Sequence, residues 1–171
     1  MSSETNQKVA LMLAKSKKVL ALGTAIVVML FSCPLYLYAA ERVIESDQVK
    51  LIQDFADGLN IPDGDTLRVV YTGSASDPSA LLRDTSGNPS YWGGNFWSNY
   101  SVVFVNTHGI TFGANANIQA ASFIASTLNI NNADFLSGNY KFFKDGGNAF
   151  IINRGNITIR NGGFVFLLSQ A

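Results

Sequence analysis

Two short segments of the sequence repeat one pattern, in which an apolar strand ends at an asparagine, turns at a glycine and resumes as a strand. The first is SVVFVNTHGITFG, residues 101–113, and the second is AFIINRGNITI, residues 149–159. β-Branched and aromatic residues flank the turn in both segments, and the asparagine takes the same place in the corner. Echoing strand–turn–strand units are typical of a solenoid, in which similar coils stack on one another.

The rest of the region after residue 99 fits the same interpretation. Asparagine is frequent there and charged residues are few, and asparagine tolerates the left-handed corners that a coil of short strands needs. We therefore predict an all-β solenoid with turns at Gly109, Gly113, Asn131–Asn132, Gly146–Gly147, Gly155 and 161–163. The predicted strands are 102–106, 110–112, 117–119, 127–130, 140–143, 149–153, 156–159 and 163–168.

The N-terminal part reads as an address segment. Four lysines before residue 19 precede an apolar run from Val19 to Tyr38 and the small residues Ala39 and Ala40. This order is typical of a secretory signal read by the Sec machinery, so we divide the chain into a signal segment, 1–40, and an exported domain, 41–171. The run is also long enough for an uncleaved membrane anchor, and Cys33 loosely resembles a lipidation site.

Between the signal and residue 101 the patterns are less uniform. Residues 42–59 fit a short helix or a first strand equally well, and Gly64 predicts a turn in IPDGD. Residues 67–73 are the first clear strand by β-branched content. Because prolines and glycines recur in residues 74–101, we predict a looping connection there, broken by a short apolar knot at Leu81 and Leu82.

Five aromatic residues cluster in that connection: Tyr91, Trp92, Phe96, Trp97 and Tyr100. No polar cluster accompanies them, which favours an aromatic lid that seals the core. The alternative is a glycan-stacking platform that uses Trp92 and Trp97, as in a small exported carbohydrate-binding or envelope module.

Composition argues against several functions. Formal net charge is zero, and no basic face remains after residue 40 to bind nucleic acid. The chain has one histidine and one cysteine, too few to build a metal site, and the sequence indicates no cofactor. The histidine, His108, lies in the predicted turn, and no motif supplies it with a catalytic partner. The solenoid region offers only Asp134 and Asp145 as acids, so we predict that the chain is not an enzyme.

Four stretches of the chain, in order, resemble the N-terminal two-partner-secretion domain of filamentous haemagglutinin-like exoproteins. They are LLRDTSGNPS (81–90), VVFVNTHGITFG (102–113), FIASTLNINNADFLSGNYKF (123–142) and IINRGNITIRNGGFVFLL (151–168). The family pattern reads roughly L-x-R-x-x-x-G-N-P-S, then V-F-L-x-N-P-N-G-I-x-F-G, A-S-T-L-x-I-x-x-x-D-F and N-x-G-x-I-x-x-x-x-G-G-x-V-x-L-L. The chain departs from it at Thr107-His108, where the family has Pro-Asn.

This resemblance implies a right-handed parallel β-helix with added hairpin and capping elements, truncated here because family members continue into a long stalk. It implies a non-enzymatic secretion domain of a surface adhesin in a Gram-negative bacterium. The implied partner is an outer-membrane β-barrel transporter whose periplasmic modules recognise the unfolded chain. The motif residues that it marks are Asn106, Gly109, Ile110, Asn153 and Gly155. A host or surface glycan or protein would be bound through the missing C-terminal region, and an inert gene fragment is the remaining alternative.

Overall fold

The computed structural model describes residues 39–169, and the first 38 residues of the predicted signal segment, 1–40, lie outside them. Fifteen strands and one short helix make up the described part of the chain. The strands before residue 100 are β1 (Glu41–Ser46), β2 (Lys50–Phe55), β3 (Thr66–Tyr71), β4 (Ser79–Asp84), β5 (Ser90–Trp92) and β6 (Asn95–Ser98). The later elements are β7 (Ser101–Val105), β8 (Ile110–Phe112), β9 (Asn117–Ala120), β10 (Ser122–Ser126), β11 (Asn129–Ile130), α2 (Asn132–Leu136), β12 (Phe142–Phe143), β13 (Ile151–Asn153), β14 (Asn156–Ile159) and β15 (Val165–Leu168).

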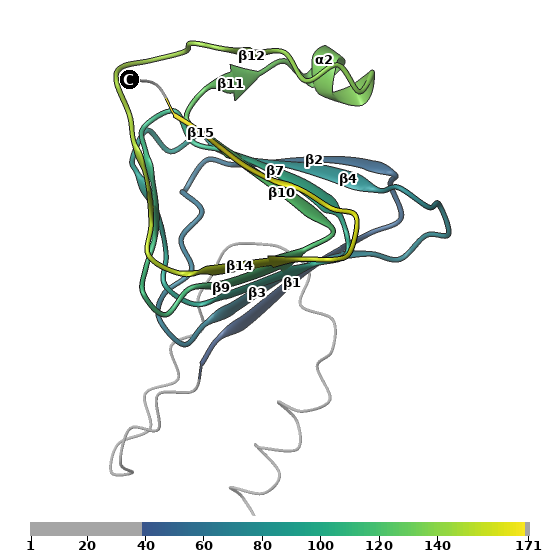
Figure 1. Ribbon diagram of the computed structural model, residues 1–171, viewed down its shortest axis with the longest axis horizontal. Coiled ribbons are helices and arrows are strands. Elements are labelled where there is room, and N and C mark those ends of the chain that lie inside the picture. The colour runs from purple at the N-terminus through teal and green to yellow at the C-terminus, as the bar shows by residue number, and fades with distance from the viewer. Residues whose placement is uncertain (1–38, 170–171) are drawn as a thin grey trace, which may run out of the picture. The chain divides into compact units, whose positions relative to one another are not determined.

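Thirteen of the strands form three parallel sheets that the chain visits in strict rotation. Sheet A has the order β1-β3-β6-β9-β14, sheet B has β15-β10-β7-β4-β2, and sheet C has β13-β8-β5. Every strand pair within these three sheets is parallel, and Ile61 adds a parallel bridge to Trp92 in sheet C. Viewed along the stack, the coil is a triangle with sheets A and B on two of its sides (Figure 1). The fold is therefore a parallel β-helix, as predicted.

Aromatic rings fill the interior of the triangle. Trp92 is fully buried, and its ring stacks on Phe96 and Phe104 with centroid distances of 4.9 and 4.4 Å. Phe112 and Phe123 surround the same ring at 5.6 and 6.1 Å. Stacked and edge-to-face contacts of this kind add to the free energy gained by burying the rings. Of the predicted aromatic lid, Trp92, Phe96 and Tyr100 are buried in the core, whereas Tyr91 is exposed and Trp97 is half-buried.

One excursion leaves the coil between β10 and β13. It contains the antiparallel pair β11–β12 and the helix α2, and it covers the outer face of sheet B (Figure 1). Phe135 of α2 and Ile130 of β11 pack there against Leu81, Val103 and Ile124. The strands β4, β7 and β10 of sheet B are therefore buried on both faces, and the apolar pair Leu81–Leu82 belongs to a strand with one residue on each side.

Several local predictions need correction. Residues 74–101 are not a looping connection, because β4, β5 and β6 all lie there and the prolines and glycines mark corners between them. Asn131–Asn132 is not a turn but the start of α2, which the prediction missed. The open choice at 42–59 resolves in favour of strands, β1 and β2. Within residues 39–169, no helix has the length and apolarity to cross a membrane.

The two echoing segments occupy different corners of the triangle, contrary to the sequence interpretation. Asn106 follows β7 and so lies where sheet B passes to sheet C, whereas Asn153 ends β13 and lies where sheet C passes to sheet A. In register, Asn153 pairs with Phe112 and not with Asn106. Similar strand–turn–strand patterns arise at both corners because each corner has the same local need for a tight polar turn.

The last coil, formed by β13, β14 and β15, has no neighbour on one side within the described residues. Its apolar side chains are accordingly exposed, with Phe150 at 66%, Phe166 at 53% and Leu167 at 42% of their accessible area. The three sheets all end at this coil with free strand edges. This end is the least protected part of the described fold.

Candidate functional site

Asn106 is the motif residue with the most contacts. It is completely buried at the corner between β7 and β8. Its Nδ2 donates hydrogen bonds to the backbone oxygen of Asn88 at 2.9 Å and to Ser90 Oγ at 2.7 Å. Its Oδ1 accepts a hydrogen bond from the backbone N–H of His108 at 2.8 Å, which closes the turn. Asn106 therefore ties its own turn to the coil before it.

A carboxylate lies one coil earlier at the same corner. Asp84 is 4% exposed, and its Oδ2 accepts hydrogen bonds from Ser90 Oγ at 2.5 Å and from the backbone N–H of Leu59 at 2.8 Å. Its Oδ1 accepts from the N–H and the hydroxyl of Ser86. Because Ser90 Oγ donates to Asp84 and accepts from Asn106, the three side chains form one buried chain of hydrogen bonds, which we call the corner network.

The surroundings of Asp84 set its charge state. Burial by itself would raise the pKa of this carboxyl, but hydrogen bonds from Leu59, Ser90 and Ser86 outweigh burial and lower the pKa below its ordinary value. Asp84 is therefore ionised in the folded protein at neutral pH. Four hydrogen bonds reach its two oxygens and stabilise the negative charge.

Gly109 and Ile110 complete the same corner. Gly109 has a φ of +123°, a conformation that residues with a Cβ adopt only with strain, and its N–H donates to the backbone oxygen of Asn106. Its carbonyl accepts a hydrogen bond from Ser90 N, and Ile110, 1% exposed, begins β8 inside the core. Thr107 and His108 form the tip of the turn, so the departure from the family pattern falls on its outer side.

Asn153 and Gly155 form a second corner, which has fewer side-chain hydrogen bonds. Asn153 is exposed, and its Oδ1 accepts one hydrogen bond, from Gly155 N at 3.1 Å. A Cβ on Gly155 would lie 2.6 Å from the backbone oxygen of Ala116 and 2.8 Å from that of Gly113. Glycine is required here because the backbone of one coil passes directly over the backbone of the coil beneath it.

Two residues of the corner network escaped the sequence prediction. Asp84 and Ser90 lie in the stretch LLRDTSGNPS, which carries the resemblance, but neither was singled out as a site residue. The register shows the missing signal: Arg83 pairs with Val105, so the next residues, Asp84 and Asn106, lie above one another. A search for polar residues one coil apart would have found the pair.

Arg83 holds the excursion against the coil. Its guanidinium donates to Asp54 Oδ1 at 2.9 Å, to the backbone oxygen of Ile130 at 3.0 Å and to Asn132 Oδ1 at 2.8 Å. Asp134 of α2 accepts hydrogen bonds from the side-chain amides of Asn131 and Asn139, both at 3.4 Å, one at each end of the helix.

The described residues contain no cluster of His, Cys, Asp and Glu that could hold a metal ion. A hollow of about 290 Å³ lies beside the turn tip, between the corner and the excursion. His108 and Asp145 both line it, but the structure gives no hydrogen bond between them, and Asp145 accepts instead from Asn129 Nδ2 at 2.7 Å. At the turn tip, Thr107 Oγ1 and His108 Nδ1 lie 3.4 Å apart, and both side chains line the same hollow.

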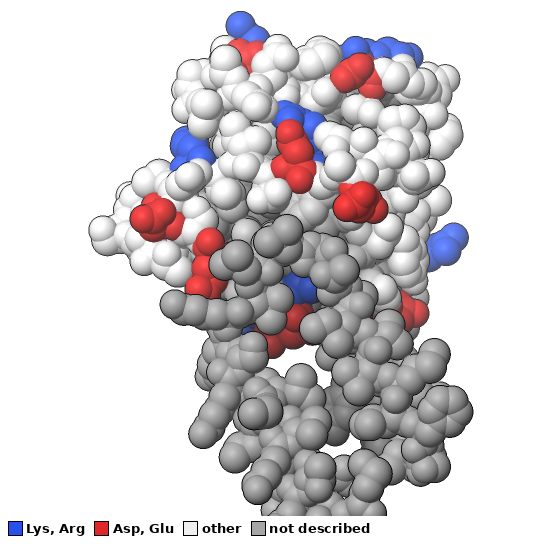
Figure 2. Space-filling view, turned by 180° about the vertical axis from the view of Figure 1, so that it is seen from behind, with Lys and Arg blue, Asp and Glu red and all other residues white. Residues whose placement is uncertain are grey.

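The two tryptophans of the glycan alternative are separated by sheet A. Trp92 lies in the core with its indole N–H bonded to the backbone oxygen of Leu59 at 2.9 Å, so neither of its faces is open to a ligand. Its place in that platform was therefore wrong. Trp97 points outward from β6 and is only half-buried. Charged side chains are scattered over the face shown in Figure 2 and form no basic block there.

Comparisons with known proteins connect this architecture to one kind of domain. No protein-family model matches the chain, and no curated protein matches it. Among solved structures, the crystal structure of the HMW1 secretion domain from Haemophilus influenzae superposes with a TM-score of 0.62 and 28% sequence identity. That match covers 72% of this chain and 35% of the HMW1 chain, and the HMW1 domain is a two-partner-secretion domain. The resemblance to two-partner-secretion domains is confirmed.

Proposed function

We propose that residues 41–169 are a secretion domain that directs a larger surface exoprotein to an outer-membrane β-barrel transporter. The likeness to the HMW1 secretion domain carries this proposal, because it joins a shared fold to 28% identity over most of the described chain. In this proposal the Sec machinery delivers the chain to the periplasm of a Gram-negative bacterium. The periplasmic modules of the transporter then bind it, and adhesion belongs to other parts of the exoprotein.

Burial of the motif residues bears on when recognition takes place. Asn106 and Ile110 expose 0% and 1% of their area in the folded coil, so a partner cannot reach their side chains there. Recognition through these residues therefore requires an unfolded or partly folded chain. An extended segment can add as a strand to the edge of a receptor sheet, with main-chain hydrogen bonds supplying affinity.

Folding after passage through the transporter follows from the same architecture. Strand pairing joins each coil to the coils before and after it, so the first coils form a template on which the next ones stack. The corner network joins two successive coils through Ser90, and it forms only when both are in place. We infer that this network marks the step at which the β-helix nucleus becomes stable outside the cell.

Secretion measured with and without a transporter tests the proposal. The full chain would be produced in a Gram-negative host with a two-partner transporter encoded beside its gene, and the released protein would be quantified. We expect release to depend on the transporter. Equal release without it would refute the secretion-domain assignment.

Two variants test the corner motif in the same assay. Asn106→Ala removes a motif side chain, and Thr158→Ala changes an exposed side chain of sheet A as a matched control. We expect Asn106→Ala to reduce release several-fold and Thr158→Ala to leave it unchanged. Equal release of both variants would show that the corner motif has no part in export.

A further inference from the structure

The outer face of sheet A carries a row of side chains that crosses its strands. Arg68 of β3 pairs in register with Trp97 of β6, Trp97 pairs with Gln119 of β9, and Gln119 pairs with Thr158 of β14. Because alternate residues of a strand point to the same face, these four side chains stand outward together, while their neighbours Phe96 and Ile118 fill the core. The row spans four adjacent strands, about 4.8 Å apart.

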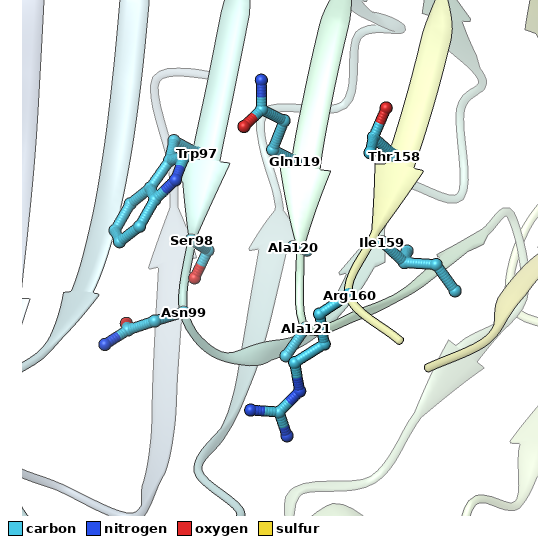
Figure 3. Close-up of a pocket in the computed structure, with 9 residues that line it drawn as sticks. All are labelled: Trp97, Ser98, Asn99, Gln119, Ala120, Ala121, Thr158, Ile159 and Arg160. Carbon is cyan, nitrogen blue, oxygen red and sulfur yellow. The ribbon is translucent and has the colours of Figure 1, made fainter. Parts of the chain in front are cut away.

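A hollow of about 330 Å³ opens beside this row. Figure 3 shows residues of β6, β9 and β14 around it, with Trp97 on one side and Arg160 at the end of the strands. Ser98 and Ala120 are buried at the floor of the hollow and Ala121 is small, so the surface is low between the larger side chains. The hollow is lined by Trp97, Ser98, Asn99, Gln119, Ala120, Ala121, Thr158, Ile159 and Arg160.

The indole of Trp97 is held in place before any ligand arrives. The guanidinium carbon of Arg68 lies over the ring, 4.6 Å from its centroid, and Arg68 is itself paired with Glu41 at 3.9 Å. Such a cation–π contact orients the ring, and the half-buried position of Trp97 limits its motion further. An aromatic ring fixed in this way binds an apolar ligand face at little cost in conformational entropy.

Polar groups in the hollow are free to bind a ligand. Gln119 and Thr158 are exposed, and within residues 39–169 neither side chain makes a hydrogen bond to the protein. Asn99 differs, because its amide already bonds the backbone N–H and oxygen of Tyr71 at 2.7 and 2.9 Å. An amide and a hydroxyl beside an aromatic ring are the groups that bind the hydroxyls of a sugar stacked on that ring.

Charge selects among sugars. Both arginines near the hollow have a carboxylate partner: Arg68 pairs with Glu41, and Arg160 with Asp77, each at 3.9 Å. No unpaired charge therefore lines the hollow among the described residues, and an anionic ligand would have to displace Asp77 from Arg160. The surroundings favour a neutral ligand.

We propose that the Trp97 hollow is a binding subsite for a neutral oligosaccharide, with one pyranose ring on the indole and its hydroxyls bonded by Gln119 and Thr158. The site lies on sheet A, away from the Asn106 corner between sheets B and C, and the proposal does not depend on the secretion function. Its geometry differs from the two-tryptophan platform that the sequence left as an alternative, since Trp92 is replaced by polar groups from β9 and β14.

Calorimetry on the purified full chain tests the subsite. The probes are the neutral hexasaccharides of cellulose, starch and chitin, with hexagalacturonate as the acidic comparison. We expect millimolar or tighter binding of at least one neutral probe, weakened at least about tenfold by Trp97→Ala and about fivefold by Gln119→Ala. Trp97→Phe, which keeps a ring, should retain part of the affinity.

Tyr91→Ala is the matched control, because Tyr91 is an exposed aromatic residue on sheet C outside the hollow. Its affinity should equal that of the unaltered chain, and circular dichroism would establish that each variant is folded. Failure of every neutral probe to bind, binding of hexagalacturonate alone, or equal affinity of Trp97→Ala would each overturn the proposal. Secretion of Trp97→Ala should be normal, which separates this test from that of the secretion domain.

Discussion

The corners at Asn106 and Asn153 share a sequence pattern and differ in nearly every physical respect. Asn106 is buried and makes three side-chain hydrogen bonds, two of them to the preceding coil. Asn153 is exposed and makes one, within its own turn. The difference arises from their positions in the stack, because Asn106 has coils on both sides whereas Asn153 lies in the last one.

This comparison separates two uses of one residue type. At either corner, asparagine closes a turn by bonding its own backbone two residues on, which any exposed loop can do. Of the two residues, only Asn106 also uses its amide Nδ2 to donate hydrogen bonds to a neighbouring coil. The energetic weight of a repeated motif in a solenoid therefore depends on what lies above and below it.

Asn106→Ala should give the largest effect. It leaves Ser90 Oγ, the Asn88 carbonyl and the His108 N–H without their side-chain partner in a buried site, which we expect to cost about 3 kcal/mol of unfolding free energy. Urea denaturation of the full chain measures it. A loss below about 1 kcal/mol would mean that water replaces the amide and that the corner is less dry than its burial indicates.

Gly155→Ala tests the close backbone packing at the Asn153 corner. The added Cβ would lie within 2.8 Å of two backbone oxygens of the coil beneath, so a shift of one coil against another is required. We expect a destabilisation of about 2 kcal/mol by urea denaturation. Gly147→Ala is the control, because a Cβ there meets nothing within 4 Å, and its effect should stay within about 0.5 kcal/mol.

Acid should weaken the Asn106 corner in particular. The pKa of Asp84 is lower in the folded than in the unfolded chain, so its stabilisation is present above the unfolded value of about 3.9 and is lost as pH falls through the folded value. We expect the urea midpoint to drop between pH 6 and pH 3. In Asp84→Asn, which cannot ionise, that drop should be smaller, and an equal drop in both proteins would assign the acid sensitivity to other carboxyls.

Asn153→Ala should have the smallest effect. One solvent-exposed hydrogen bond to Gly155 is lost, and water can replace it, so we expect less than about 0.5 kcal/mol. The same urea titration compares it with Asn106→Ala. If the two variants were equally destabilised, burial and coil neighbours would not explain the difference between the corners.

Local patterns predicted much of this fold. The strands at 110–112 and 156–159 have the predicted bounds, because β-branched residues between glycine and asparagine corners leave little freedom. The strands in 74–101 were missed since Pro78 and Pro89 read as a loop, although a coil of short strands needs such residues at every corner. The helix α2 was missed because it spans only Asn132–Leu136.

The strand register across the excursion could not be predicted from the sequence pattern. Asn95 pairs with Asn117 after 22 residues, but Asn117 pairs with Asn156 after 39, since the excursion lies between them. An uneven period hides which residues stack across the excursion, whereas Asp84 and Asn106 precede it and follow the 22-residue period of the earlier coils. Asn106 was found from local similarity, whereas two of its hydrogen-bond partners, Asn88 and Ser90, belong to another coil.

The excursion begins and ends at neighbouring points of the coil. Thr127 Oγ1 donates to the backbone oxygen of Ala149 at 3.3 Å, so the residue before the excursion lies next to the residue after it. Because the entropy of closing a loop grows only slowly with its length, this segment can be lengthened or exchanged at little cost to the coil. The constraint on any replacement is that it cover Leu81, Val103 and Ile124, as Phe135 now does.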